Sequence, residues 1–251
     1  MATVFEKSSF CLITGASQGL GREIALQFSN NWEKSGKKSD VVLIARNKDG
    51  LEETKSLIKS SAPGVNVHVF PIDLGDLDQL QSLCPTLLKI GDPSRHDQFI
   101  MVHNAGTIDT FDCTLAQLSD GHTTRKFFDI NYTSMTVLTA HFLSKFPQKA
   151  SLIIHMTSLL ATVYIAGFPL YSPSRAARNA YIGVLVAENP DVRVLNYSPG
   201  PCDTEMYKKI PEEIKKGFMA VLTPAESINK LVKVICEDQY KNGGVMDYFD
   251  C

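Results

Sequence analysis

Several features that mark other classes of protein are missing from this sequence of 251 residues. Its six cysteines are scattered and form no Cys-x-x-Cys pair, which argues against a zinc site and a disulfide framework and favours a reducing compartment. Neither sign of charge dominates, because 25 lysines and arginines stand against 27 acidic residues, for a net charge of -2. Nucleic acid and anionic membranes are therefore not expected partners, and a small molecule is.

Targeting signals are also missing. Residues 1–9 show neither the apolar core of a signal peptide nor the Arg-rich amphipathic pattern of a transit peptide, which predicts a cytoplasmic protein. One stretch, residues 150–174, runs 25 residues without Asp, Glu, Lys or Arg and has the length of a membrane helix. Histidine, threonine, serine and proline interrupt its apolar character, so we interpret it as a buried strand, a loop and a helix start.

Apolar residues make up 44% of the chain, in short runs that alternate with longer amphipathic segments. This pattern is typical of strands buried on both faces and joined by crossover helices. It predicts an α/β fold, a doubly wound parallel sheet of about seven strands with helices on both faces, in a single domain over residues 1–251. Strands are expected at Phe10–Thr14, Asp40–Ala45, Val65–Phe70, Gln98–His103, Ser151–Met156, Val192–Tyr197 and Gly244–Met246. Helices are expected at Leu20–Asn31, Lys48–Ser60, Leu77–Ile90, Thr124–Ser144, Tyr171–Glu188, Glu212–Met219 and Ala225–Glu237.

A glycine-rich turn follows the first expected strand. Gly15, Gly19 and Gly21 permit a tight turn and a close backbone approach, and the helix N-terminus behind them offers unpaired N–H groups to a pyrophosphate. The spacing differs from the commoner Gly-x-Gly-x-x-Gly fingerprint, and a plain structural turn is the alternative. Between a strand and a helix, the turn predicts a dinucleotide site in a Rossmann-like fold, with further contacts from Ser17, Gln18 and Leu20.

The second expected strand ends in Ala45-Arg46-Asn47, where an acidic residue would select NAD by binding the ribose 2'-hydroxyl. Arg46 would instead bind a 2'-phosphate, which predicts NADP(H) as the cofactor. The alternative is a solvated arginine at the start of a helix. Asp73, after the third strand, is a candidate acceptor for the adenine amino group or a cap for the next helix.

Further motifs follow in a characteristic order. Asn104-Ala105-Gly106 comes after the fourth strand, Asn131 lies in a long helix, Ser158 follows the fifth strand, and Tyr171 comes thirteen residues later. With the glycine turn, they resemble the short-chain dehydrogenase/reductase family over nearly the whole chain. The resemblance implies an NADP-dependent oxidoreductase acting on carbonyl and CH–OH groups. It also implies cofactor contacts from Asn47, Leu74, Asn104, Ala105, Gly106, Tyr171, Arg175, Pro199, Gly200 and Thr204.

Reduction of a ketone requires a proton for the oxygen as well as a hydride for the carbon. Tyr171 is the candidate proton donor, and Ser158 would hydrogen-bond the same oxygen and hold it in place. The resemblance implies that Asn131 anchors a water relay from solvent. Taken alone, Ser158 and Tyr171 are typical of loop and core residues, and only their spacing within one βα unit points to catalysis.

One position departs from the family pattern. The family has a lysine four residues after the tyrosine, which binds the nicotinamide ribose, whereas this chain has Arg175 one helical turn along the same face. Arginine keeps the positive charge but is larger and does not release its proton. We expect turnover to be intact or slowed, with a catalytically impaired NADPH-binding regulatory protein as the alternative. Arg178, the next turn along, is expected at the surface.

Three segments, Asn131–Met135, Asn189–Met206 and Val245–Asp250, resemble family members that reduce side-chain carbonyls of pterins in tetrahydrobiopterin biosynthesis. This implies that Asp247 binds the amino-pyrimidine edge of the pterin, next to Ser158 and Tyr171; an exposed tail carboxylate is the alternative. Other small ketones or diketones are the alternative substrates, since loops set substrate choice. A homodimer is implied, with contacts through residues 124–144 and 171–188. No metal is expected, because no His, Cys or acidic cluster has ligand spacing.

Overall fold

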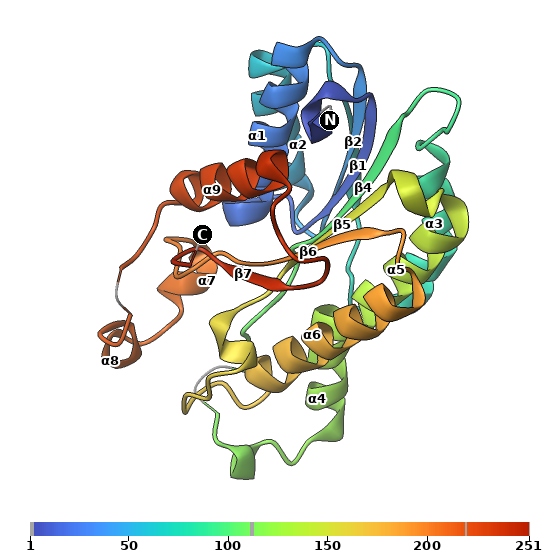
Figure 1. Cartoon of the computed structure of the whole chain (residues 1–251). Coiled ribbons are helices and arrows are strands. Elements are labelled where there is room, and N and C mark those ends of the chain that lie inside the picture. The colour runs from blue at the N-terminus through green and yellow to red at the C-terminus, as the bar shows by residue number, and fades with distance from the viewer. Residues whose placement is uncertain (1–2, 111–112, 219, 251) are drawn as a thin grey trace.

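The computed structural model describes residues 3–110, 113–218 and 220–250. In this part of the chain, seven parallel strands form one sheet in the order β3-β2-β1-β4-β5-β6-β7 (Figure 1). The strands are β1 (Ser9–Thr14), β2 (Ser39–Ala45), β3 (Asn66–Pro71), β4 (Gln98–His103), β5 (Ser151–Met156), β6 (Arg193–Ser198) and β7 (Val245–Asp247). The strand order changes direction between β1 and β4, so the crevice at their carboxyl ends is the expected ligand site.

Helices cover both faces of the sheet (Figure 1). Apolar side chains of α1, α2 and α9 belong to one core cluster, and those of α3, α5 and α6 belong to the other. Alternate residues of β1 enter opposite clusters, because successive side chains of a strand point to opposite faces. None of the helices in the described ranges is long and apolar enough to cross a membrane. The helices are α1 (Gly19–Ser35), α2 (Lys48–Ser61), α3 (Leu77–Lys89), α4 (Gly121–Phe128), α5 (Ser134–Lys145), α6 (Tyr171–Glu188), α7 (Glu205–Lys208), α8 (Glu212–Lys215) and α9 (Pro224–Glu237).

The predicted doubly wound α/β fold is confirmed, and each predicted strand is present with its ends displaced by no more than one residue. The single helix predicted at Thr124–Ser144 is wrong in detail, because a π-helical turn, Asp129–Thr133, separates α4 from α5. Within that turn Asn131 Nδ2 donates to Phe127 O at 3.1 Å. The side chain therefore competes with the backbone amide of the same residue for the carbonyl that an α-helical hydrogen bond would use.

The helix predicted at Glu212–Met219 also differs from the structure. Helix α8 ends at Lys215, and the chain continues as tight turns in which Gly217 N donates to Ile214 O at 3.0 Å. Glycine has a low helix propensity, which accounts for the early end. Met219 lies outside the described residues. The short helix α7, which starts after Thr204, was not predicted.

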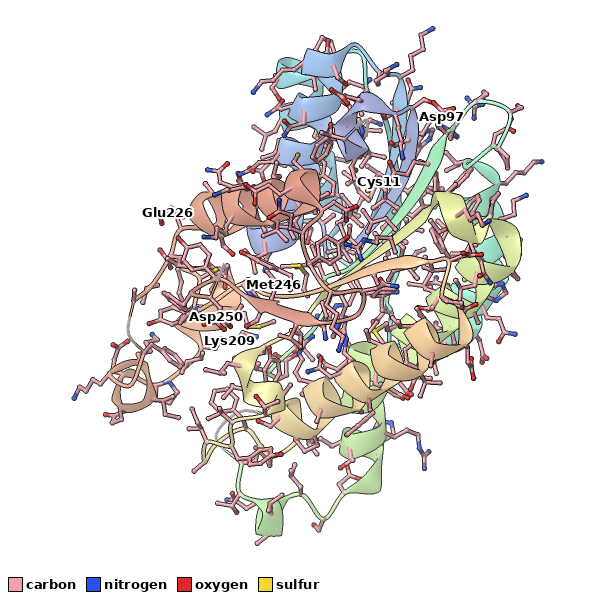
Figure 2. The ribbon with its side chains drawn as sticks, in the orientation of Figure 1. Cys11, Asp97, Lys209, Glu226, Met246 and Asp250 are labelled. Carbon is pink, nitrogen blue, oxygen red and sulfur yellow. The ribbon has the colours of Figure 1, made fainter. Side chains whose placement is uncertain are left out.

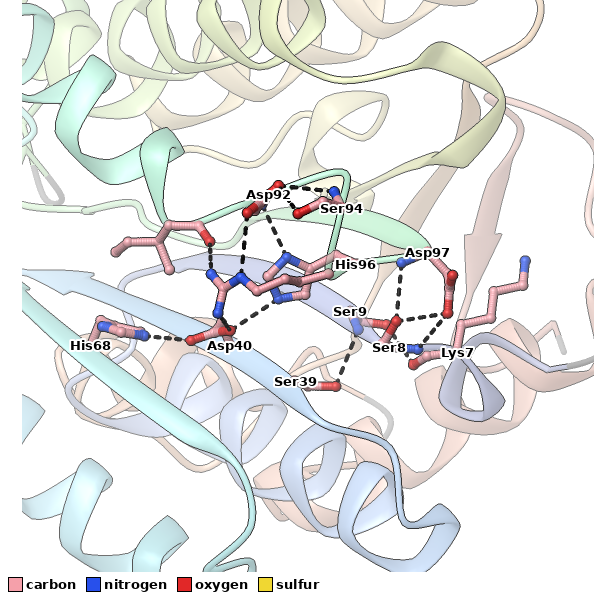
Figure 3. A network of polar contacts seen from close by, with 12 residues as sticks. Lys7, Ser8, Ser9, Ser39, Asp40, His68, Asp92, Ser94, His96 and Asp97 are labelled. Carbon is pink, nitrogen blue, oxygen red and sulfur yellow. Dashed lines mark hydrogen bonds and ion pairs between the residues drawn. The ribbon is translucent and has the colours of Figure 1, made fainter.

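Asp40, at the amino end of β2, is held by two histidines at the end of the sheet remote from the crevice (Figure 3). Its carboxylate accepts hydrogen bonds from His68 Nε2 at 2.7 Å and from His96 Nε2 at 3.0 Å. Burial alone would raise the pKa of Asp40, but the hydrogen bonds and charges of the two histidines outweigh it and lower that pKa. The network ties β2 to β3 and to the segment that enters β4.

Candidate active site

A cleft of about 310 Å³ opens at the carboxyl edge of the sheet, and residues that follow each strand from β1 to β6 line it. Most of the predicted cofactor residues lie in its wall: Gly15, Ser17, Gln18, Gly19, Leu20, Gly21, Arg46, Asn47, Asp73, Leu74, Asn104, Ala105, Gly106, Tyr171, Arg175, Pro199 and Thr204. Gly200 is not among the lining residues. The wall also contains residues that sequence reasoning missed: Ala45, Ile72, Thr107, Ile130, Met156, Thr157 and Met206.

The glycine turn between β1 and α1 has the close backbone contacts that its spacing predicts. Gly15 and Gly19 have φ of +71° and +54°, in the left-handed region that favours glycine. A Cβ atom on Gly21 would collide with the carbonyl group of Gly15, so only hydrogen fits there. Gln18 caps α1 without a side-chain hydrogen bond, which leaves the first amides of the helix for a bound anion.

Side chains from outside the turn hold it in place. Arg22 of α1 donates to Ser17 O at 2.6 Å, and Thr54 of α2 donates to Ala16 O at 3.0 Å. Asn104 Nδ2 donates to Thr14 O at 2.9 Å, which joins the loop after β4 to the loop after β1. These bonds hold the loop after β1 against α1, α2 and the loop after β4.

Arg46, Asn47 and Asp73 lie at the β2–β3 side of the cleft. Arg46 is exposed, and Asn47 caps α2 by accepting a hydrogen bond from Gly50 N at 3.0 Å. The Asp73 carboxylate accepts from Gly75 N at 2.9 Å. Of these three side chains, that of Arg46 is positively charged and well placed to meet an anionic group in the cleft.

Tyr171 and Arg175 lie together at the other end of the cleft. Arg175 is only 3% exposed, and its Cζ atom lies 4.7 Å from the centroid of the Tyr171 ring. Its Nη1 atom donates to Met156 O at 3.3 Å. A Cβ atom on Gly106 would collide with Nη2 of Arg175, so the guanidinium lies directly on the Gly106 backbone. The arrangement fixes a positive charge beside the tyrosine.

Ser158 and Asn131 are not among the residues that line the cleft, although each adjoins residues that do. Ser158 follows β5 and accepts a hydrogen bond from Leu160 N at 3.2 Å, at the start of a 3-10 turn, Leu159–Ala161, that packs on α6. Asn131 is fully buried, and its Oδ1 atom accepts from Thr107 N at 3.0 Å. Its side chain thus supports the loop that follows Gly106.

Asp247 and Gly200 lie at or just after the carboxyl ends of β7 and β6 and are not among the residues that line the cleft. Asp247 ends β7, opposite Ser198 of β6, and its Oδ1 atom accepts from Phe249 N at 3.0 Å. Gly200 has φ of +71°, and a Cβ atom there would lie 3.1 Å from Leu222 Cδ1 and 3.3 Å from Phe249 Cε2. Gly200 therefore packs against the C-terminal segment, which explains why Pro199 lines the cleft and Gly200 does not.

An ion pair joins the loop that follows β4 to the segment that follows β6. Lys209, just past α7 (Figure 2), lies 2.8 Å from Asp109 in the loop that follows β4. The hydrogen bond from Lys209, assisted by one from Thr107, lowers the pKa of Asp109. The contact links loops that are 100 residues apart in the sequence.

The prediction that Arg178 lies at the surface is wrong, because the residue is 1% exposed. Its neighbours His103 and His155 are also buried. Burial and the charge of Arg178 lower the pKa of His103 to about 3, and the same causes lower the pKa of His155. Both histidines are therefore neutral, and the positive charges in this region are those of the arginines.

Comparison with known proteins agrees with this architecture. The family model described as short chain dehydrogenase matches residues 9–215. Sepiapterin reductase of Bos taurus is 30% identical over 256 residues, covering 96% of this chain and 95% of the bovine one, and that of Rattus norvegicus is 29% identical over 254 residues. A short chain dehydrogenase crystal structure from Salmonella enterica serovar Typhi superimposes with a TM-score of 0.78 at 20% identity, covering 98% of both chains. The chain therefore belongs to the short-chain dehydrogenase/reductase family of oxidoreductases.

Proposed function

We propose that this protein is an NADPH-dependent carbonyl reductase that reduces side-chain carbonyls of a pterin. The observation that supports this most strongly is the pairing of Tyr171 with Arg175 in the wall of the same cleft that the glycine turn lines. A proton donor next to a fixed positive charge, within reach of a dinucleotide site, is the arrangement that ketone reduction requires.

The cleft fits a phosphorylated nicotinamide dinucleotide. Its glycine turn leads into the first amides of α1, which no side chain caps and which would bind a pyrophosphate, and Arg46 in the cleft wall would bind a 2'-phosphate. When bound, NADPH would supply the hydride. Gly106, Pro199 and Thr204 would contact its nicotinamide end, and Asp73 its adenine.

The residues of the chain supply the proton and the orientation. Tyr171 would donate its proton to the substrate oxygen, and Arg175 would stabilise the negative charge that then develops on the tyrosine oxygen. Ser158, which follows β5 and borders α6, would hydrogen-bond the substrate oxygen. Asn131, whose side chain is bonded to Thr107 and Phe127 and whose carbonyl accepts from Arg178, would anchor a water relay from solvent.

The choice of a pterin is supported by the similarity to sepiapterin reductases, which extends over 96% of the chain. In this proposal Asp247 pairs with the amino-pyrimidine edge, where a carboxylate can accept from two adjacent N–H donors. The single domain over residues 1–251, the cytoplasmic location and a homodimer formed through α4, α5 and α6 belong to the same proposal.

The test is NADPH consumption with a panel of sepiapterin, a diketo pterin and simple diketones, with NADH run in parallel. We expect the highest kcat/KM for a pterin with NADPH. Preference for simple diketones would support a reductase of different substrate class. Tight NADPH binding with no oxidation of NADPH by any of these carbonyls would contradict the proposal and favour a regulatory protein.

A further inference from the structure

The Arg178 guanidinium is buried among backbone carbonyl groups. Nη2 donates to His103 O at 3.0 Å, and Nη1 donates to Ala105 O at 3.1 Å and to Asn131 O at 3.3 Å. No ion pair with a carboxylate is seen for it within the described ranges, and its Nε atom is buried without a hydrogen-bond partner. A buried charge without a counter-ion destabilises a fold, so its presence here requires an explanation.

The three carbonyls belong to the structures that form one end of the cleft. His103 ends β4, Ala105 precedes Gly106 in the cleft wall, and Asn131 lies in the π-helical turn. The amides of this loop are bonded on the opposite side, since Asn104 N and Ala105 N both donate to Thr14 Oγ1 at 3.1 Å. Thr14 therefore holds the loop from β1, and Arg178 holds it from α6.

Hydrogen bonds from neutral donors could also satisfy these carbonyls, so the positive charge of Arg178 requires a separate explanation. Tyr171, Arg175 and Arg178 are spaced four and three residues apart and lie on one face of α6. Burial and the neighbouring Arg175 lower the pKa of Arg178, whereas the acidic group that acts in the opposite direction is Tyr171. An anion formed on the Tyr171 oxygen, two helical turns before Arg178 on that face, would interact favourably with this buried cation.

We infer that Arg178 is a positioning residue for the proposed reaction: it fixes the loop of residues 103–107 against α6 and places a second positive charge behind Tyr171. The inference rests on the proposed function for its second part. Two arginines, one beside the tyrosine ring and one a turn deeper, then share the task of stabilising the tyrosine after it has given up its proton.

The test compares Arg178→Met, Arg178→Gln and Arg178→Lys in the full-length chain. Methionine removes donors and charge, glutamine keeps neutral donors, and lysine keeps the charge. Arg193→Met is the matched control, because Arg193 is also held by hydrogen bonds, to Asp238 and Tyr240, and does not line the cleft. The measurements are melting temperature, amide hydrogen exchange of residues 103–107, NADPH affinity, and kcat and KM with sepiapterin.

For Arg178→Met we expect amide exchange at residues 103–107 to accelerate about tenfold or more, because three carbonyls lose a charged donor. We expect kcat to fall about 30-fold or more with KM for sepiapterin within about threefold of native. Glutamine should restore slow exchange without restoring kcat, and lysine should restore kcat to within about tenfold. A purely structural role would instead lower the melting temperature and leave kcat of the folded protein unchanged.

Native kcat in Arg178→Met, or equal kcat in the Gln and Lys variants, would overturn the role of the charge. Native exchange at residues 103–107 in Arg178→Met would overturn the role in loop positioning. A native protein that reduces no carbonyl would overturn the proposed function and the role of the charge with it. The positioning of the loop would in that case still be decided by the exchange rates, which do not depend on turnover.

Discussion

Replacing Gly106 with alanine tests the contact between the loop after β4 and Arg175, which stands where the family has lysine. The added Cβ atom would collide with Arg175 Nη2 and would lie 3.0 Å from Asn131 Oδ1. Arg175 has little freedom to move away, because it is 3% exposed and packs on the Tyr171 ring. Either the loop or the guanidinium must shift.

Overpacking of this kind costs about 1–3 kcal/mol of unfolding free energy. In a chain of this size each kcal/mol lowers the melting temperature by about 2–4 °C, so a decrease of roughly 2–12 °C is expected. Displacement of Arg175 from Tyr171 by about 1 Å would also lower kcat, by about 100-fold on the scale of misplaced catalytic groups.

The assay is thermal denaturation together with sepiapterin turnover for Gly106→Ala, Arg175→Lys and the double variant. Gly121→Ala is the matched control, since nothing lies within 4 Å of a Cβ atom built there. Lysine has no planar fork, so the cost of Gly106→Ala should be about 1 kcal/mol smaller in the Arg175→Lys background. The reasoning is refuted if Gly106→Ala is as stable and active as Gly121→Ala, or if its cost is the same in both backgrounds.

Three further predictions concern other parts of the molecule. Arg46→Ala should remove most of the preference for NADPH over NADH, about 1.5–3 kcal/mol, measured as the ratio of dissociation constants; equal affinities in the native protein would contradict it. Asp247→Asn should lower kcat/KM for sepiapterin much more than it weakens NADPH binding, because one acceptor becomes a donor, and unchanged pterin kinetics would show an uninvolved carboxylate. Asp40→Asn should lower the unfolding free energy at pH 7 by about 1–3 kcal/mol, since a buried hydrogen bond from His96 and a partly buried one from His68 lose their carboxylate. Because the pKa of Asp40 is lowered in the folded state, this stabilisation is present above about pH 4 and is lost as the pH falls further. Urea titrations should therefore show that the difference in unfolding free energy between the native protein and Asp40→Asn becomes smaller in acid. A difference that does not change with pH would contradict this cause.

The sheet could be predicted from the sequence because each central strand is a short apolar run with polar residues or glycine at its ends. Strands buried on both faces appear in a sequence as nearly continuous apolar runs, which explains why the bounds of β4 and β5 were predicted without error. The break between α4 and α5 could not be predicted, since it depends on bonds that Asn131 makes to Thr107 and Phe127 once the chain has folded.

The cleft residues that were predicted are those next to glycines or family motifs. Ile130, Met156 and Met206 were missed because apolar residues in a strand or helix have no local signal that separates a cleft wall from a core. Arg178 was misplaced for a related reason. An arginine on a helix normally faces solvent, and the carbonyls that bind this one come from segments 47 to 75 residues away in sequence.

The rate at which the native protein oxidises NADPH in the presence of sepiapterin, compared with that of Tyr171→Phe, decides whether Tyr171 is the proton donor of a carbonyl reductase. Phenylalanine keeps the ring next to Arg175 and removes only the hydroxyl that would donate the proton. We predict measurable turnover in the native protein, native-like NADPH affinity in the variant, and a rate reduced by about 10²–10⁴-fold, the usual contribution of a general acid. Equal turnover by the two proteins, or none by the native protein despite tight NADPH binding, would contradict the account.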